Sequence, residues 1–99
     1  MNRYFIMKGI LMLTKDFLDE AIRLTSNDRN KDYGDILETH ENIAALWSAF
    51  LRKNISAHDV AMCMALVKVA RSMHKQKVDN YVDAAAYLAI AGEISERTK

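Results

Sequence analysis

Two aspartates toward the end of the chain, Asp79 and Asp83, are spaced to act on one ligand. They stand four residues apart, about one turn of an α-helix, so their carboxylates lie on the same side. Asp83 shares its helical face with Tyr87 and Ile90, and a carboxylate on such a face needs a cation, a metal or several hydrogen-bond donors. The pair is a candidate site for Mg²⁺ or another ligand. Alternatively, Asp79 caps the helix and Asp83 makes a structural ion pair.

A second pair, Lys68 and Arg71, could supply positive charge to Asp83 or to a phosphate group. The two are three residues apart, and Lys75 follows one turn later. Arginine suits bidentate contacts with phosphate or carboxylate, and lysine provides a point charge. The alternative is an ordinary solvated basic face. The candidate ligand site on these two segments comprises Lys68, Arg71, Asp79, Asp83 and Tyr87.

The polar run from residue 25 to 34 is predicted to be a loop, because it has no hydrophobic periodicity and ends in glycine. Gly34 allows a positive φ immediately before a predicted helix. Arg29 and Tyr33 would then lie next to a helix N-terminus, which favours anions. We therefore add these two residues to the candidate ligand-binding set.

Helices must position these residues, because the 99-residue chain has no proline and only three glycines, which argues against a turn-rich β-fold. Hydrophobic periodicity predicts helices at about 14–25, 36–52, 57–76 and 80–96. We expect an all-α fold, a four-helix antiparallel bundle with an extra N-terminal segment. Residues 14–99 would form a single helical domain. Residues 1–13 would be an extension from an upstream start, since Met7 and Met12 offer later ones.

Helix ends and faces can also be predicted. Ser56 and Asp59 resemble a capping box, and Thr14 and Asp79 are expected N-caps. His40 lies on an apolar face and is expected to be a hydrogen-bonded interior histidine. The apolar face predicted for the helix at 57–76 consists of Val60, Met62, Cys63, Leu66, Val67, Val69, Ala70 and Met73.

Composition argues against several classes of protein. Fourteen basic and thirteen acidic residues give a net charge of +1, so nucleic-acid binding is not expected. The apolar stretch at 4–13 is too short to span a bilayer and is interrupted by Lys8, so no membrane association is expected. The single cysteine, Cys63, fits a reducing compartment. We therefore expect a cytoplasmic protein.

The order of the motifs is more specific than any one of them. A D-Y-G loop at 32–34, K-x-x-R at 68–71 and D-x-x-x-D at 79–83 with Tyr87 occur in that order. This order resembles a small phage and prophage family of uncharacterised helical proteins over about residues 16–94. It is also similar to the first nucleotide-modification-associated domain. The resemblance implies a nucleotide or nucleotide-derived phosphate ligand. If a phage encodes the protein, the expected location is the host cytoplasm.

A further similarity is to the MazG-type all-α nucleoside triphosphate pyrophosphatases, which hold Mg²⁺ with E-x-x-E and E-x-x-D pairs on adjacent helices. Asp79 and Asp83 would stand for the second pair, at a spacing one residue longer. Lys68 and Arg71 stand where the first pair would be needed. Glu38 and Glu41 lie one helix earlier. This departure favours phosphate binding over metal-dependent hydrolysis.

Three functions follow from these observations. The chain could bind a small phosphate-bearing ligand, act as a Mg²⁺-dependent pyrophosphatase, or serve as a non-enzymatic interaction protein. In the last case, a phage accessory or host-defence-modulating role, the polar cluster would be structural. In each case we expect a homo-oligomer, a dimer or higher, because the bundle is small and its last helix is rich in alanine.

Overall fold

The structure, a computed structural model, describes residues 11–26 and 34–99. Within these ranges it consists of helices and contains no strand, which confirms the prediction of an all-α fold with four helices. The helices are α1 (Thr14–Leu24), α3 (Ile36–Leu51), α4 (Ala57–His74) and α5 (Val78–Arg97). Each end lies within two residues of the position expected from hydrophobic periodicity.

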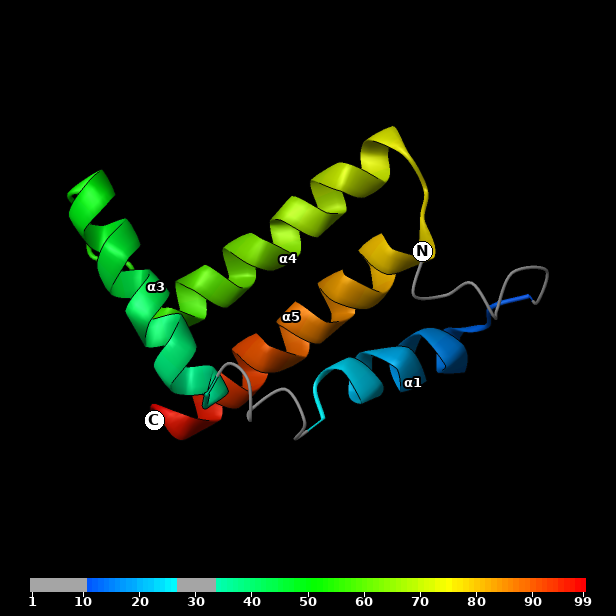
Figure 1. Cartoon of the computed structure of the whole chain (residues 1–99), viewed down its shortest axis with the longest axis horizontal. Helices are drawn as coiled ribbons and strands as arrows, with labels where there is room; N and C mark the ends of the chain where they lie inside the picture. The colour runs from blue at the N-terminus through cyan, green and yellow to red at the C-terminus, as the bar shows by residue number, and fades with distance from the viewer. Residues whose placement is uncertain (1–10, 27–33) are drawn as a thin grey trace.

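The central unit of the fold is the hairpin of α4 and α5. These helices lie side by side and antiparallel, joined by the short connection at residues 75–77 (Figure 1). α1 lies along the N-terminal half of α5 and runs in the same direction (Figure 1). α3 packs against α4 at a steep angle (Figure 1). The α5 helix therefore forms the common wall against which α1 and α4 pack.

The core consists of two clusters along α5. In the first, Ala21 of α1 packs with Val82 and Ala86, and Phe17 and Leu24 cover them. In the second, the buried residues are Ala57 and Ala61 of α4 with Ala91 and Ile94 of α5. Most of these side chains are small, which allows the helix backbones to approach closely. The close approach fixes which side chains of α4 and α5 face each other farther along the hairpin.

Local signals at the helix ends account for most of the boundaries. The Oγ of Ser56 accepts from the amide of Asp59, and the Ser56 amide donates to the Asp59 carboxylate, both at 3.0 Å, which confirms the capping box. Gly34 has φ +80°, as predicted. Asp35 follows it and caps α3 by accepting from the amide of Glu38 at 3.3 Å. These two features place the start of α3 directly after the polar run.

Two predicted caps are wrong. The N-cap of α1 is Leu13 rather than Thr14, and the Leu13 amide donates to the carboxylate of Asp16 at 2.9 Å. The N-cap of α5 is Lys77, so Asp79 lies inside the first turn. An acidic residue is also favoured there, because the unpaired amide groups at the N-terminus of a helix carry a partial positive charge. The residue types near a helix start therefore do not show which residue is the N-cap and which lies inside the first turn.

The predicted apolar face of α4 is also largely wrong. Val60 is fully buried, but Leu66 and Met73 are 62% and 82% exposed. The other residues that α4 buries are Ala57, Ala61 and Ala65. Alanine-rich surfaces of α4 and α5 pack closely against each other, and this contact takes precedence over burial of the larger side chains. The helix is consequently rotated so that Lys68 faces α5.

Among the helices of the described residues, none is both long enough and apolar enough to cross a lipid bilayer.

Candidate functional site

An ion pair between Lys68 and Asp83 joins α4 to α5. The Nζ of Lys68 lies 3.5 Å from Oδ2 of Asp83, and the two side chains are only 15% and 19% exposed. Lys68 occurs one turn after the buried Ala65, so the same rotation that buries the alanines carries this lysine to the interface. Lys68 therefore belongs to the α4–α5 interface and not to a solvated face.

The pair lies at one end of a basic cleft between the last turns of α4 and the first turns of α5. This cleft has a volume of about 390 Å³. Its lining residues are Lys68, Arg71, His74, Lys75, Lys77, Asp79, Asn80 and Asp83. Four predicted site residues, Lys68, Arg71, Asp79 and Asp83, thus line one cleft. His74, Lys77 and Asn80 were missed, although the α4–α5 hairpin necessarily places its connecting residues beside the two helix ends.

Positive charge exceeds negative charge in the basic cleft. Four lysine and arginine side chains line it against two aspartates. Lys68 is matched by Asp83, whereas Arg71, Lys75 and Lys77 are solvent-exposed and form no ion pair within residues 11–26 and 34–99. A multiply charged anion would therefore meet three side chains whose charge is available.

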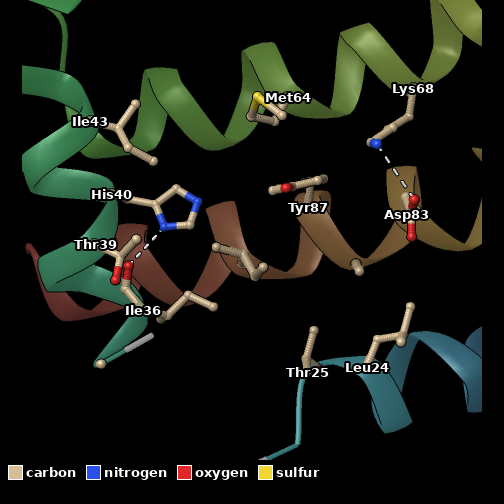
Figure 2. Close-up of a pocket in the computed structure, with 13 residues that line it drawn as sticks. Leu24, Thr25, Ile36, Thr39, His40, Ile43, Met64, Lys68, Asp83 and Tyr87 are labelled. Atoms are coloured by element: carbon tan, nitrogen blue, oxygen red, sulfur yellow. Dashed lines mark hydrogen bonds and ion pairs between the residues drawn. The ribbon is translucent and has the colours of Figure 1, made fainter. Parts of the chain in front are cut away.

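A second pocket, which we call the apolar pocket, adjoins the basic cleft because Lys68 and Asp83 line both. It also has a volume of about 390 Å³, and Tyr87 lies on its wall (Figure 2). Its apolar lining comes from all four helices and comprises Leu24, Ile36, Ile43, Met64, Ala86 and Ile90. Tyr87, a predicted site residue, therefore lies beside the predicted charged residues but in a different compartment.

His40 of α3 lines the apolar pocket at the end opposite the Lys68–Asp83 pair (Figure 2). The residue is 6% exposed, and its Nδ1 lies 2.8 Å from the carbonyl oxygen of Ile36. This confirms the expectation of a hydrogen-bonded interior histidine. The His40 and Tyr87 rings are 6.4 Å apart between centroids, with their planes at 65°. Sequence reasoning missed His40 as a pocket residue. Its place on an apolar helical face indicates that it is buried, but does not show whether it is buried in the core or beside a pocket.

The remaining predicted residues fall elsewhere. Arg29 and Tyr33 lie outside the residues that the structure describes. Glu38 and Glu41 are exposed on α3 and line neither pocket.

The residues of the basic cleft fit an anion better than a metal ion. Asp79 and Asp83 share the cleft, as a common Mg²⁺ would require, but Lys68 already lies against Asp83. In the described part of the chain, no three His, Cys, Asp or Glu side chains come together in a group that could hold a metal. Magnesium usually takes one or two carboxylates together with substrate phosphates. Mg²⁺ binding by Asp79 and Asp83 therefore stays a prediction.

The fold and the site define a small all-α domain with a basic cleft next to an apolar pocket. Residues 16–95 match the family model described as "Domain of unknown function (DUF6378)", and the chain belongs to this family. The matched range agrees closely with the stretch over which the motif order resembles a phage-type helical family.

Two curated relatives are mycobacteriophage proteins. The chain is 39% identical over 88 residues to the Gene 55 protein of Mycobacterium phage D29, which covers 85% of this chain and 56% of the relative. It is 40% identical over 75 residues to the Gene 55 protein of Mycobacterium phage L5, which covers 74% of this chain and 48% of the relative. The chain thus spans about half the length of these relatives. No solved structure matches it.

These relationships confirm a phage-type family of unknown function. The further resemblances, to the first nucleotide-modification-associated domain and to the MazG-type pyrophosphatases, stay predictions.

Proposed function

We propose that the protein binds a small phosphate-bearing ligand, a nucleotide or a nucleotide derivative, in the basic cleft between α4 and α5. The observation that carries this proposal is the convergence of Arg71, Lys75 and Lys77 beside the Lys68–Asp83 pair. Arg71 lies on α4, and Lys75 and Lys77 lie in the connection between α4 and α5. A solvated basic face on one helix would not produce such a concave arrangement.

The chemistry of the basic cleft suits a phosphate. The guanidinium of Arg71 can donate two parallel hydrogen bonds to phosphate oxygens, while the lysines add point charges. Asp83 restrains the ammonium group of Lys68 before a ligand arrives, so less side-chain freedom is lost on binding. Asp79 and Asp83 limit the surplus of positive charge, which favours a small anion over a long polyanion.

Isothermal titration calorimetry and thermal unfolding with pyrophosphate and nucleoside mono- and triphosphates would test this proposal. We expect at least one probe to bind and to raise Tm, because a ligand that binds only the folded state stabilises it. Lys75→Met should weaken binding about tenfold, a change of about 1.4 kcal/mol. Lys53→Met, at an exposed position just after α3, is the matched control and should not change affinity. A flat response to every probe would overturn the proposal.

A second candidate function, that of an oligomeric interaction protein, is favoured by the large apolar side chains on the surface. Leu66 and Met73 on α4 are 62% and 82% exposed. Together with Cys63 and Ala70 they follow the alternating three- and four-residue spacing of a coiled-coil seam. We call Cys63, Leu66, Ala70 and Met73 the outer α4 seam, and its occupant would be the same seam of a second copy.

The outer α4 seam contains no charged side chain, whereas Arg71 and Lys75 line the basic cleft on the side toward α5. Two copies of the seam can therefore pack together without burying a charge. The predicted homo-oligomer would then be formed through the face of α4 that lies away from α5.

A further inference from the structure

We infer that the apolar pocket holds a flat heterocycle, such as a nucleobase, and that His40 accepts a hydrogen bond from an N–H group of that heterocycle. This inference rests on the proposed function, because it assigns the second half of the same ligand. It adds His40 as a binding residue and names the part of the ligand that His40 would recognise.

The first step concerns the protonation of His40. Nδ1 lies 2.8 Å from the Ile36 carbonyl oxygen, which can only accept a hydrogen bond. Nδ1 must therefore carry the proton, and in the neutral ring Nε2 is then a hydrogen-bond acceptor. The backbone of α3 fixes both the tautomer and the direction of the ring.

The second step concerns the surroundings of Nε2. Figure 2 shows the second ring nitrogen facing the pocket, on the side toward Tyr87. No hydrogen bond joins Nε2 to another residue within the described ranges. His40 is 6% exposed as a whole, but Nε2 is not one of the buried polar atoms that lack a partner, so this nitrogen can be reached from the pocket. Nε2 is therefore available as an acceptor at the end of the pocket away from the Lys68–Asp83 pair.

The third step concerns the shape and chemistry of the apolar pocket. Its volume of about 390 Å³ lies within the range of small-molecule sites, roughly 300–1,000 Å³. Ile43, Met64 and Ile90 provide apolar surface, and the Tyr87 ring offers a surface for aromatic contact. A heterocycle with an N–H or NH₂ group satisfies both the apolar surface and the acceptor. A purely aliphatic group would leave Nε2 unsatisfied.

The fourth step connects the apolar pocket to the basic cleft. Tyr87 lies between His40 and the Lys68–Asp83 pair (Figure 2). Because Lys68 and Asp83 line both compartments, one ligand can extend from His40 past this pair into the basic cleft. Its base would lie against Tyr87 and its phosphates beside Arg71.

The experiment compares pyrophosphate with the four deoxynucleoside monophosphates by isothermal titration calorimetry on the full chain. We expect at least one nucleotide to bind at least tenfold more tightly than pyrophosphate. The tightest nucleotide is then replaced by its analogue methylated at every N–H of the base, which should bind at least tenfold more weakly. Pyrophosphate binding without any nucleotide preference would overturn this inference and leave the proposed function standing. Failure of every probe to bind would overturn both.

The variant His40→Phe provides a second test, because it keeps a ring but removes the acceptor. It should lower the affinity for the selected nucleotide at least tenfold and change that for pyrophosphate less than twofold. His58→Phe, an exposed position on α4, is the matched control. Unchanged nucleotide affinity in a folded His40→Phe protein would overturn the inference. If that variant does not fold, the methylated analogue on the unmodified chain decides the question.

Discussion

The ammonium nitrogen of Lys68 lies 3.5 Å from Oδ2 of Asp83, and this contact ties the C-terminal half of α4 to the N-terminal half of α5. Asp83→Asn would leave the largely buried lysine without its counter-charge. We expect unfolding free energy to fall by about 1–3 kcal/mol, less than for a fully enclosed pair, since both side chains keep some contact with water. Urea denaturation followed by circular dichroism measures this change.

The double variant Lys68→Met/Asp83→Leu is the control for that experiment. Replacing both charges by apolar groups removes the unmatched lysine, so it should be less destabilising than Asp83→Asn. If the double variant is the more destabilised, other contacts of the two side chains contribute more to stability than the attraction between their charges.

The ion pair between Asp35 and Arg97 makes stability depend on pH. Two guanidinium nitrogens of Arg97 lie 3.0 and 2.9 Å from the two carboxylate oxygens of Asp35, and these hydrogen bonds hold the pKa of Asp35 below its usual value. A carboxylate with a lowered pKa in the folded state stabilises above its unfolded pKa of about 3.9. That contribution is lost as the pH falls through the folded pKa.

Asp35→Asn should therefore flatten the acid limb of the stability curve. Urea midpoints measured between pH 5 and pH 2.5 should fall less steeply in the variant than in the unmodified chain. The Asp59 carboxylate remains in both proteins, and its pKa is also lowered, by hydrogen bonds from Ser56, so part of the slope should persist. Equal slopes in the two proteins would show that the Arg97 contact does not couple to folding.

The capping box at the start of α4 should contribute measurably to stability. Ser56→Ala removes the acceptor for the Asp59 amide and should lower the unfolding free energy by about 1 kcal/mol. Ser72→Ala in the same helix removes only a hydroxyl that donates to the Val69 carbonyl. It should change stability by less than about 0.5 kcal/mol. A similar loss in both variants would argue against a specific capping effect.

The outer α4 seam should control the oligomeric state. Size-exclusion chromatography with light scattering should give a mass above that of one chain, and Leu66→Glu with Met73→Glu should reduce it. Leu88→Glu on α5, also at an exposed leucine, is the control and should leave the mass unchanged. A single-chain mass for the unmodified protein would exclude this interface at the concentrations measured.

The helices could be predicted from the sequence because their ends carry local signals. The capping box of Ser56 and Asp59 marks the start of α4, and the positive φ of Gly34 comes just before α3. Each signal depends only on residues that are close together in the sequence. Asp79 shows the limit of such signals, since an acidic residue is favourable both as an N-cap and inside the first turn. The apolar residues then determine the extent of each helix but not its rotation.

The rotation of α4 could not be predicted because it depends on its partner. Ala61 and Ala65 are buried while Leu66 is exposed, since the closest approach of α4 and α5 is made by small side chains. A prediction from one sequence gives most weight to large apolar residues, and so it assigns the face with Leu66 to the core. The same limit applies to His40, whose contact with a pocket depends on where α3 meets α4 and α5.

The α4–α5 hairpin also has a consequence for the order of folding. Its helices are joined by a three-residue connection, so little chain entropy opposes their association. α1 instead packs mainly on α5, which begins more than fifty residues later in the chain. At a synthesis rate of about 5–20 residues per second, α1 would wait roughly 3–10 seconds on the ribosome for its docking surface. We therefore expect the hairpin to nucleate folding and α1 to attach last.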